Sequence, residues 1–406
     1  MLTTVIYRSH LCADIPYNVL EKMVAEANRK NGDLSITGIL LFNGTHLFQL
    51  LEGPEEEVLS IYNAICCDER HHNIVELLRD YAPSRRFGNY GMELFDIRQH
   101  ERDEVLQNVL DKGTTRYQLR YQDRALQFFR TFVESREKET YFELPSPDDW
   151  EFVKNSSELT VTVPDPFPDE PYSFAFQPII DPLAREVVSM EALLRTKPGA
   201  SPLAYFEELQ GHDIYVADLK SKKLAFARAG HLDLGSMTLS VNLFPMTLVN
   251  VPGAVEFLLT HITSNNLVPE QIIVEFTELE VISRLDEFTG AVRQLKAAGI
   301  SIAIDDFGAG FAGLKLLSLF QPDRIKITRE LIGNIHKNGA RQAIIHGLLH
   351  ACQSLEIQVT AVGIEHVEEW MWLESAGIEH FQGFLFARPE LDCFPSVAWP
   401  EKKSDF

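Results

Sequence analysis

The spacing of apolar residues changes between the period of a strand and that of a helix along the first part of the chain. β-Branched and aromatic residues predict a strand at 3–9, and apolar positions three or four apart predict a helix over 16–31. Further strands are predicted at 36–42, 46–53, 73–78 and 91–95, and a helix over 55–67. The pair Asn43-Gly44 predicts a tight hairpin turn. The resulting order, βαββαββ, predicts a ferredoxin-like α+β sandwich.

An amphipathic helix with an aromatic face is predicted over 124–133. Phe128, Phe129 and Phe132 fall at helical spacing with Ala125. We interpret this helix as a cap packed on the sheet, and also as a segment that transmits a signal to the second half of the chain.

Two stretches rich in proline and acidic residues, at 144–149 and 163–171, favour extended and poorly packed chain. They mark the predicted boundary between two domains. The predicted organisation is a first domain at 1–95, a helical cap at 96–140, a linker at 141–170 and a second domain at 171–400.

In the second domain, short apolar strands alternate with helical stretches from Phe174 onward. Predicted strand ends fall at 191–195, 239–242, 272–275, 302–305, 324–327 and 358–361. Repeated βα units of this size predict a modified (β/α)8 barrel. Because strand ends share one face of a barrel, their polar residues are expected to meet there.

The composition narrows the class of protein. A chain of 406 residues is long enough for two or three domains, and its net charge of −22 argues against a basic surface that binds nucleic acid directly. The five cysteines are scattered without metal-type spacing, which fits a reducing compartment. No leader of signal-peptide type and no apolar run of about 20 residues is present. We therefore expect a cytoplasmic protein without a membrane segment.

Two adjacent carboxylates, Asp305 and Asp306, end a predicted strand and precede a glycine-rich turn. Like charges this close are costly unless a cation lies between them. Hard divalent ions with oxygen ligands are the natural candidates.

Residues 1–95 resemble the BLUF family of flavin-binding blue-light sensors. The resemblance is carried by Tyr7 and by the segments 30–31, 36–38, 48–53, 68–71 and 91–92. It implies a flavin cofactor, FAD, although the residues leave FMN and riboflavin open. It implies these flavin-site residues: Tyr7, Lys30, Asn31, Gln49, Arg70, His71 and Met92.

The same resemblance implies distinct roles within that site. Tyr7 would donate an electron and a proton, and Gln49 would rearrange, since an amide carries both a donor and an acceptor. Asn31 would hold the flavin carbonyl edge, and Met92 would relay the change outward. Arg70 and the adjacent histidine would lie near the cofactor tail.

The second domain resembles the EAL family of phosphodiesterases that linearise cyclic di-GMP. The matching segments are 191–193, 242, 275–278, 305–308, 326 and 382–386. The resemblance implies two Mg²⁺ or Mn²⁺ ions that activate a water for attack on the phosphodiester. It implies that Glu191, Asn242, Glu275 and Asp305 hold the first ion and that Asp305 and Asp306 hold the second. It also implies that Lys326 acts on the water, Arg195 clamps a phosphate, Glu278 anchors the loop after 307, and Gln382 contacts substrate.

One departure from the family pattern stands at Val362, where the family has a glutamate that completes the second metal site. Valine has no ligand atom, and Glu365 lies three residues away, so it cannot simply substitute. The family also has an aspartate where this chain has Thr328. We therefore expect an intact first metal site and a damaged hydrolytic centre.

Two functions are compatible with these patterns. The whole chain, including 398–403, resembles enterobacterial blue-light-regulated antirepressors with a degenerate EAL domain. That resemblance implies light-dependent binding of a MerR-like repressor, and the acidic charge suits a basic partner. The alternative is a light-activated cyclic di-GMP phosphodiesterase, inactive or weakly active because of Val362. EAL relatives are commonly dimers, which implies a homodimer.

Overall fold

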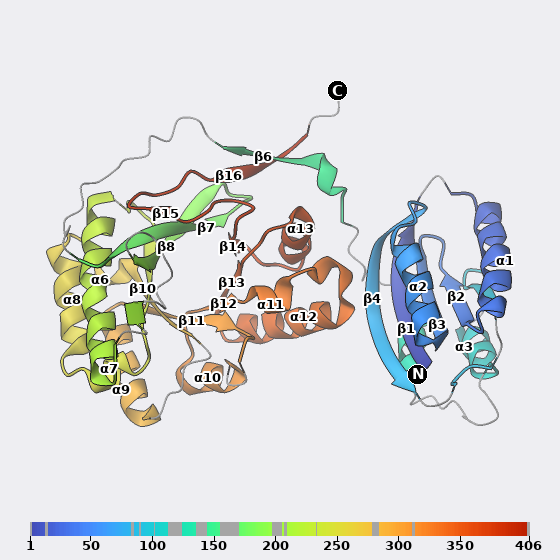
Figure 1. The fold of residues 1–406 in the computed structure, drawn as a ribbon, viewed down its shortest axis with the longest axis horizontal. Helices are drawn as coiled ribbons and strands as arrows, with labels where there is room; N and C mark the ends of the chain where they lie inside the picture. Colours follow the sequence, from blue (N-terminus) through green and yellow to red (C-terminus); the bar gives the residue numbers. More distant parts are fainter. Residues whose placement is uncertain are drawn as a thin grey trace. The chain divides into compact units, whose positions relative to one another are not determined.

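The structure is a computed structural model of the chain. It describes residues 2–12, 15–82, 85–88, 91–100, 102–112, 124–134, 144–154, 170–196, 205–206, 209–232, 234–277, 284–310 and 313–403. The chain forms two compact units (Figure 1). The first comprises Met1–Leu144 and Asn334–Ile344, and the second comprises Pro145–Gly333 and Ile345–Phe406.

The first unit contains a five-stranded sheet with the strand order β4-β1-β3-β2-β5. Its strands and the two helices between them are β1 Leu2–Leu11, α1 Tyr17–Asp33, β2 Thr37–Phe42, β3 His46–Pro54, α2 Glu55–Cys66, β4 His71–Ala82 and β5 Gly91–Asp96. The predicted βαββαββ order is confirmed. Within the sheet, β2 and β5 run parallel, while β1 pairs with β3 and β4 in antiparallel fashion.

Successive side chains along each strand point to opposite faces of the sheet, and both faces carry apolar residues. On one face, Val58 and Ile61 of α2 pack in a cluster with Val5. Leu20 of α1 packs with Leu40 on that same face. The two helices thus cover the face that also carries the odd-numbered side chains of β1.

The other face of the sheet is covered by α3 Arg102–Leu110 and α4 Arg124–Glu134. The ring of Phe48 lies 5.0 Å, between centroids, from Phe129 and 5.0 Å from Phe132. The aromatic face of α4 is therefore buried on the sheet, as the sequence predicted for a cap.

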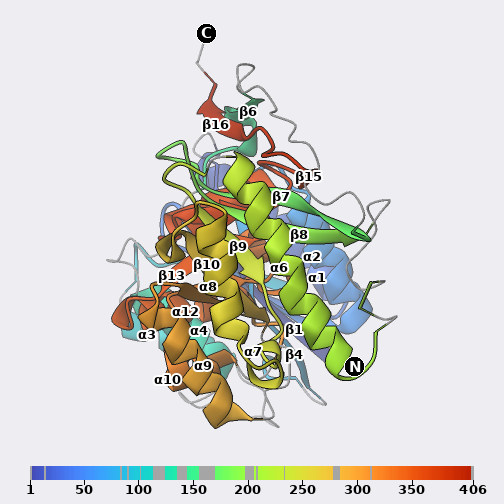
Figure 2. The ribbon, with the colours of Figure 1, turned by 90° about the vertical axis from the view of Figure 1, so that its left-hand side faces the viewer.

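The second unit is a closed barrel of eight strands, surrounded by helices that include α6, α8 and α9 (Figures 1 and 2). The strands are β7 Tyr172–Asp181, β8 Glu186–Thr196, β9 Thr238–Asn242, β10 Ile272–Thr277, β11 Ser301–Phe307, β12 Arg324–Ile327, β13 Gln358–Val362 and β14 His380–Gln382. The helices that follow these strands are α6 His212–Leu232, α7 Thr247–Asn250, α8 Ala254–Ser264, α9 Leu285–Ala297, α10 Gly313–Phe320, α11 Arg329–Ile332, α12 Gly339–Ser354 and α13 Val367–Ser375.

The first barrel strand runs against its neighbours. β7 is antiparallel to β8, and a pairing of Ile180 with Phe381 of β14 closes the barrel. The remaining neighbours from β8 to β14 pair in parallel. β8 pairs with β9 only from Ser189 to Ala192 and continues to Thr196 beside β7. Glu191 therefore lies within a strand, whereas the sequence placed it at a strand end.

Part of the predicted linker is ordered by the far end of the chain. Within 141–170, β6 Trp150–Lys154 pairs in antiparallel fashion with β16 Ala398–Lys402. The ring of Trp150 also lies 5.0 Å from that of the buried Trp370. The composition predicted extended chain but not its partner, because a strand's partner is set by tertiary pairing.

No helix within the described residues is both long enough and apolar enough to cross a membrane.

Candidate functional sites

A cavity of about 530 Å³ lies between α1, α2 and the sheet of the first unit. Apolar side chains such as Leu20, Ile61 and Ile65 form much of its wall. All seven predicted flavin-site residues line it: Tyr7, Lys30, Asn31, Gln49, Arg70, His71 and Met92. A cavity of this size with apolar walls and converging polar groups is typical of a small-molecule or cofactor site.

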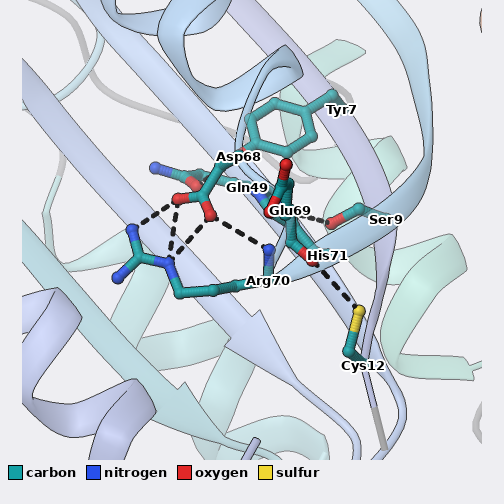
Figure 3. Close-up of polar contacts among 8 residues, drawn as sticks. All are labelled: Tyr7, Ser9, Cys12, Gln49, Asp68, Glu69, Arg70 and His71. Carbon is teal, nitrogen blue, oxygen red and sulfur yellow. Dashed lines mark hydrogen bonds and ion pairs between the residues drawn. The ribbon is translucent and has the colours of Figure 1, made fainter.

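Tyr7 and Gln49 stand directly opposite each other on β1 and β3. The Tyr7 hydroxyl donates a hydrogen bond to Oε1 of Gln49, and Nε2 of Gln49 donates to Sδ of Met92 at 3.5 Å. Tyr7 and Gln49, which Figure 3 draws as sticks, are both buried. Burial raises the pKa of the Tyr7 phenol well above its usual value, so this side chain holds its proton at neutral pH.

Asn31 lines the cavity near β5, and Gly38 leaves room for two of the cavity's side chains. Asn31 is buried and donates from Nδ2 to the carbonyl oxygen of Gly91 at 3.4 Å. A Cβ at position 38 would lie 2.7 Å from Sδ of Met92 and 3.0 Å from Nδ2 of Asn31. Only glycine leaves these two side chains in place, which explains a glycine inside a central strand.

Arg70 and His71 reach the cavity from the start of β4. Arg70 forms an ion pair with Asp68 at 2.5 Å, and its side chain is 46% exposed (Figure 3). Nδ1 of His71 lies 2.9 Å from Oγ of Ser9, and the imidazole is buried. The roles of Asp68 and Ser9 were not predicted from the sequence. Ser9 meets His71 only because β1 pairs with β4, and the sequence does not reveal that pairing.

In the second unit, Glu191, Glu275 and Asp305 gather carboxylate oxygens that lie within 4.8 Å of one another. Nζ of Lys326 lies 2.7 Å from Glu191, 2.7 Å from Glu275 and 3.5 Å from Asp305. Burial, with repulsion from the other carboxylates, raises the pKa of Glu275 to about 8. Burial opposes the charge of Lys326, but these carboxylates raise its pKa well above the usual value. One ammonium cannot neutralise three carboxylates, so the cluster suits a divalent cation.

Two amides fix the orientation of Glu191. Nδ2 of Asn242 donates to Oε1 at 2.8 Å, and Nε2 of Gln382 donates to Oε2 at 2.9 Å. They come from β9 and β14, on opposite sides of β8 in the order of the barrel strands. Strand pairing therefore brings together residues that are far apart in the sequence.

Asp306 departs from the alternation of its strand. Its φ is 51°, in the left-handed region, and the register of β11 with β12 breaks between Ile304 and Phe307. Such a bulge re-aims a side chain. Asp306 lines a cavity of about 510 Å³ together with Arg195, Asn242 and Glu275. The predicted Glu278 lies outside the described residues.

Val362 ends β13 and pairs in register with Gln382. The nearby Glu365 is exposed, and its carboxylate lies 3.0 Å from Nη2 of Arg329. Arg329 also donates to the carbonyl oxygen of Gly363. Glu365 is therefore held by an arginine, an ion pair that would compete with a bound cation for this carboxylate.

One buried ion pair that lines the same barrel cavity was not predicted from the sequence. Nζ of Lys222 lies 2.6 Å from Oδ1 of Asp218 on α6. The other carboxylate oxygen accepts from the backbone N–H of Phe244 at 2.9 Å and from Oγ1 of Thr247 at 2.6 Å. The spacing i, i+4 is visible in the sequence, but it is far commoner on exposed helix faces.

These two folds define a two-domain protein of the BLUF-EAL type. The chain belongs to the BLUF family, "sensors of blue-light using FAD", which matches 2–93, and to the EAL domain family, which matches 169–389. Over 404 residues it is 61% identical to the "Blue light- and temperature-regulated antirepressor BluF" of Escherichia coli K12. That similarity covers 99% of this chain and 100% of the relative.

Solved structures give the same result for the fold. Klebsiella pneumoniae BlrP1, in a manganese and cyclic di-GMP complex at pH 6, matches with a TM-score of 0.92 and 42% identity. BlrP1 with FMN and cyclic di-GMP but no metal ions matches with a TM-score of 0.87 and 38% identity. Both matches cover 99% of this chain and 100% of the other. The predicted combination of a ferredoxin-like BLUF domain and an EAL barrel is confirmed.

Proposed function

We propose that this chain is a light-dependent antirepressor whose EAL domain works by binding a MerR-like repressor rather than by turnover. The observation that carries the proposal is Val362, which stands where the family has a carboxylate ligand for a second ion. The full-length similarity to an antirepressor supports it. The net charge of −22 suits a partner with a basic, DNA-binding surface.

In the flavin domain, the residues present fit the cofactor that the family implies. A bound flavin would supply absorption of blue light and a one-electron acceptor. Tyr7 holds a proton and donates it toward Gln49, whose amide can reverse its hydrogen bonds. Asn31 would fix the carbonyl edge of the ring system, and Met92, bonded to Gln49, would carry the change to β5.

The remaining residues of this site surround the cofactor tail in our proposal. Arg70, Lys30 and His71 line the cavity, and the first two place positive charge there. Positive charge suits a phosphate-bearing tail. We propose FAD, in line with the family description.

In the barrel, the residues present fit one divalent ion better than two. Glu191, Glu275 and Asp305 with the oxygen of Asn242 form an oxygen-rich set for Mg²⁺ or Mn²⁺. Such an ion would supply Lewis-acid chemistry. A second ion would have Asp305 and Asp306 but no carboxylate at Val362.

The remaining predicted groups would act on a bound cyclic dinucleotide. Lys326 would orient water, Arg195 would contact a phosphate, and Gln382 would contact the nucleotide. We propose that cyclic di-GMP binds this cavity and that cleavage is slow or absent.

The test compares purified chain in the dark and under blue light. Cyclic di-GMP hydrolysis is measured with Mg²⁺ or Mn²⁺, and capture of a MerR-like repressor is measured on immobilised protein. The proposal expects no light-dependent hydrolysis and a light-dependent increase in capture. Hydrolysis that rises with light, together with capture that does not change, would overturn it.

A light-activated phosphodiesterase is the second candidate function. It is favoured by the converging carboxylates beside Lys326 and by a cavity that also contains Arg195. Under this alternative, Asp306 and a solvent ligand would hold the second ion. The same hydrolysis assay separates the two candidates.

A further inference from the structure

Three histidines form a row across neighbouring strands at one end of the flavin-domain sheet. His10 of β1 pairs in register with His46 of β3 and with His72 of β4. The ring of His10 lies 4.3 Å from that of His46 and 5.4 Å from that of His72, measured between centroids. Because His10 follows Tyr7 by three positions on β1, the row lies on the face opposite the flavin cavity.

The central histidine of this row has unsatisfied bonding capacity. His10 is only 3% exposed, and neither of its ring nitrogens has a hydrogen-bond partner. Leaving a buried polar group unpaired is unfavourable.

A thiol completes the group. Sγ of Cys12 lies 3.6 Å from Nδ1 of His72, and its side chain is partly exposed. On a tetrahedral zinc ion with a Zn–S distance of about 2.3 Å and a Zn–N distance of about 2.0–2.1 Å, the two ligand atoms lie about 3.6 Å apart. The thiol and imidazole therefore already have the separation of two ligands on one ion.

We propose that Cys12, His10, His46 and His72 form a zinc site on the face of the flavin-domain sheet opposite the flavin cavity. Imidazole and thiolate ligands select a borderline ion such as zinc over the magnesium or manganese suited to the barrel. Among the described residues, only the barrel carboxylates bring three ligand atoms within 4.8 Å of one another, so zinc binding here requires the rings of His10 and His46 to rotate. The ligands come from three strands, which is why their sequence spacing gives no metal motif.

The test is zinc titration of the full-length, flavin-loaded chain without a histidine tag, under reducing conditions and with Mn²⁺ present for the barrel carboxylates. Calorimetry is expected to show one zinc equivalent that His10→Gln and Cys12→Ser each weaken by at least about tenfold, since even loss of an outer-shell partner costs about 10–100-fold. His100→Gln is the matched control, because His100 is a partly exposed histidine of the same domain. It is expected to bind zinc as wild type does.

X-ray absorption at the zinc edge gives a second readout, with one sulfur expected at about 2.3 Å and nitrogens at about 2.0–2.1 Å. Flavin absorbance checks that each variant is folded. If His10→Gln fails to retain flavin, the partly exposed Cys12→Ser decides the outcome. Equal zinc affinity in wild type, Cys12→Ser and His100→Gln, or a shell of oxygen and nitrogen alone, would overturn the proposal.

Discussion

Nη2 of Arg329 lies 3.0 Å from the carboxylate of Glu365, so the glutamate that survives in this part of the barrel is already paired. The same arginine contacts the buried carboxylate of Glu369 at 3.3 Å. Both glutamates lie beyond the end of β13, where Val362 presents a hydrocarbon side chain. The end of this strand is thus organised by an arginine that pairs with both nearby carboxylates.

This arrangement predicts that Val362→Glu restores a ligand for a second ion. Cyclic di-GMP hydrolysis with Mn²⁺ is expected to rise by about 10²-fold, because misplacement of a reacting water by about 1 Å costs that much in rate. The measurement is the initial rate of product formation per mole of enzyme, taken while product increases linearly with time. Glu365→Gln is the control and should leave the rate of the Val362→Glu background unchanged. A Val362→Glu variant that binds Mn²⁺ more tightly yet gains no turnover would show that the defect lies elsewhere.

The contacts of Lys326 with Glu191 and Glu275 predict that this lysine stabilises the barrel when no ion is bound. Lys326→Met leaves buried carboxylates without their cation, and such a loss costs about 3–5 kcal/mol. Unfolding of the barrel, followed by circular dichroism in a chelator, should begin at a lower temperature than in wild type. Added Mn²⁺ should raise the midpoint temperature of unfolding by more in the variant than in wild type.

Lys315→Met is the matched control for that experiment, since Lys315 is an exposed lysine of α10. It should unfold as wild type does in both conditions. If Lys326→Met in chelator were as stable as Lys315→Met, the ammonium would not be the counter-ion of the cluster.

Most helices and strands of the flavin domain could be predicted from the sequence, because each one shows the apolar spacing of its own type of secondary structure. The strand that holds Tyr7 and the helix that holds Asn31 are visible in local patterns of apolar residues. The position of Gln49 opposite Tyr7 follows once a hairpin joins β2 and β3 and β1 pairs with β3. Local patterning therefore predicted the elements, whereas the side chains that reach the cavity were implied by the family resemblance.

Relationships between distant segments were not predictable in the same way. The pairing of Trp150–Lys154 with Ala398–Lys402 and the ion pair of Arg329 with Glu365 depend on tertiary packing. The left-handed backbone of Asp306 depends on a break in strand register. Period and composition report on burial and local conformation, and they do not report on which distant backbone or charge becomes the partner.

The hydrogen bond from Tyr7 to Gln49 predicts that replacing Tyr7 and replacing its neighbour Tyr62 have different effects on the flavin spectrum. Tyr7→Phe removes the donor and should abolish the light-induced red shift of the flavin spectrum while flavin remains bound. Tyr62 lies 5.4 Å from Tyr7 between ring centroids and contacts it through the ring, so Tyr62→Phe should retain the shift. Light-minus-dark absorbance of the purified variants measures both. If Tyr7→Phe keeps the red shift, the hydrogen bond from Tyr7 to Gln49 is not required for the photochemistry.

The close approach of Gly38 to Met92 predicts that the contact between Gln49 and Met92 requires a glycine, without a Cβ, at position 38. In Gly38→Ala the added Cβ would lie 2.7 Å from Sδ of Met92, so the methionine must move away from Gln49. Overpacking of this kind costs about 1–3 kcal/mol, and flavin release should occur at a lower temperature. Met92→Ala removes the obstruction, so the double variant should be destabilised by less than the sum of the two single variants. Flavin fluorescence during heating measures all three, and strictly additive effects would contradict a direct contact between positions 38 and 92.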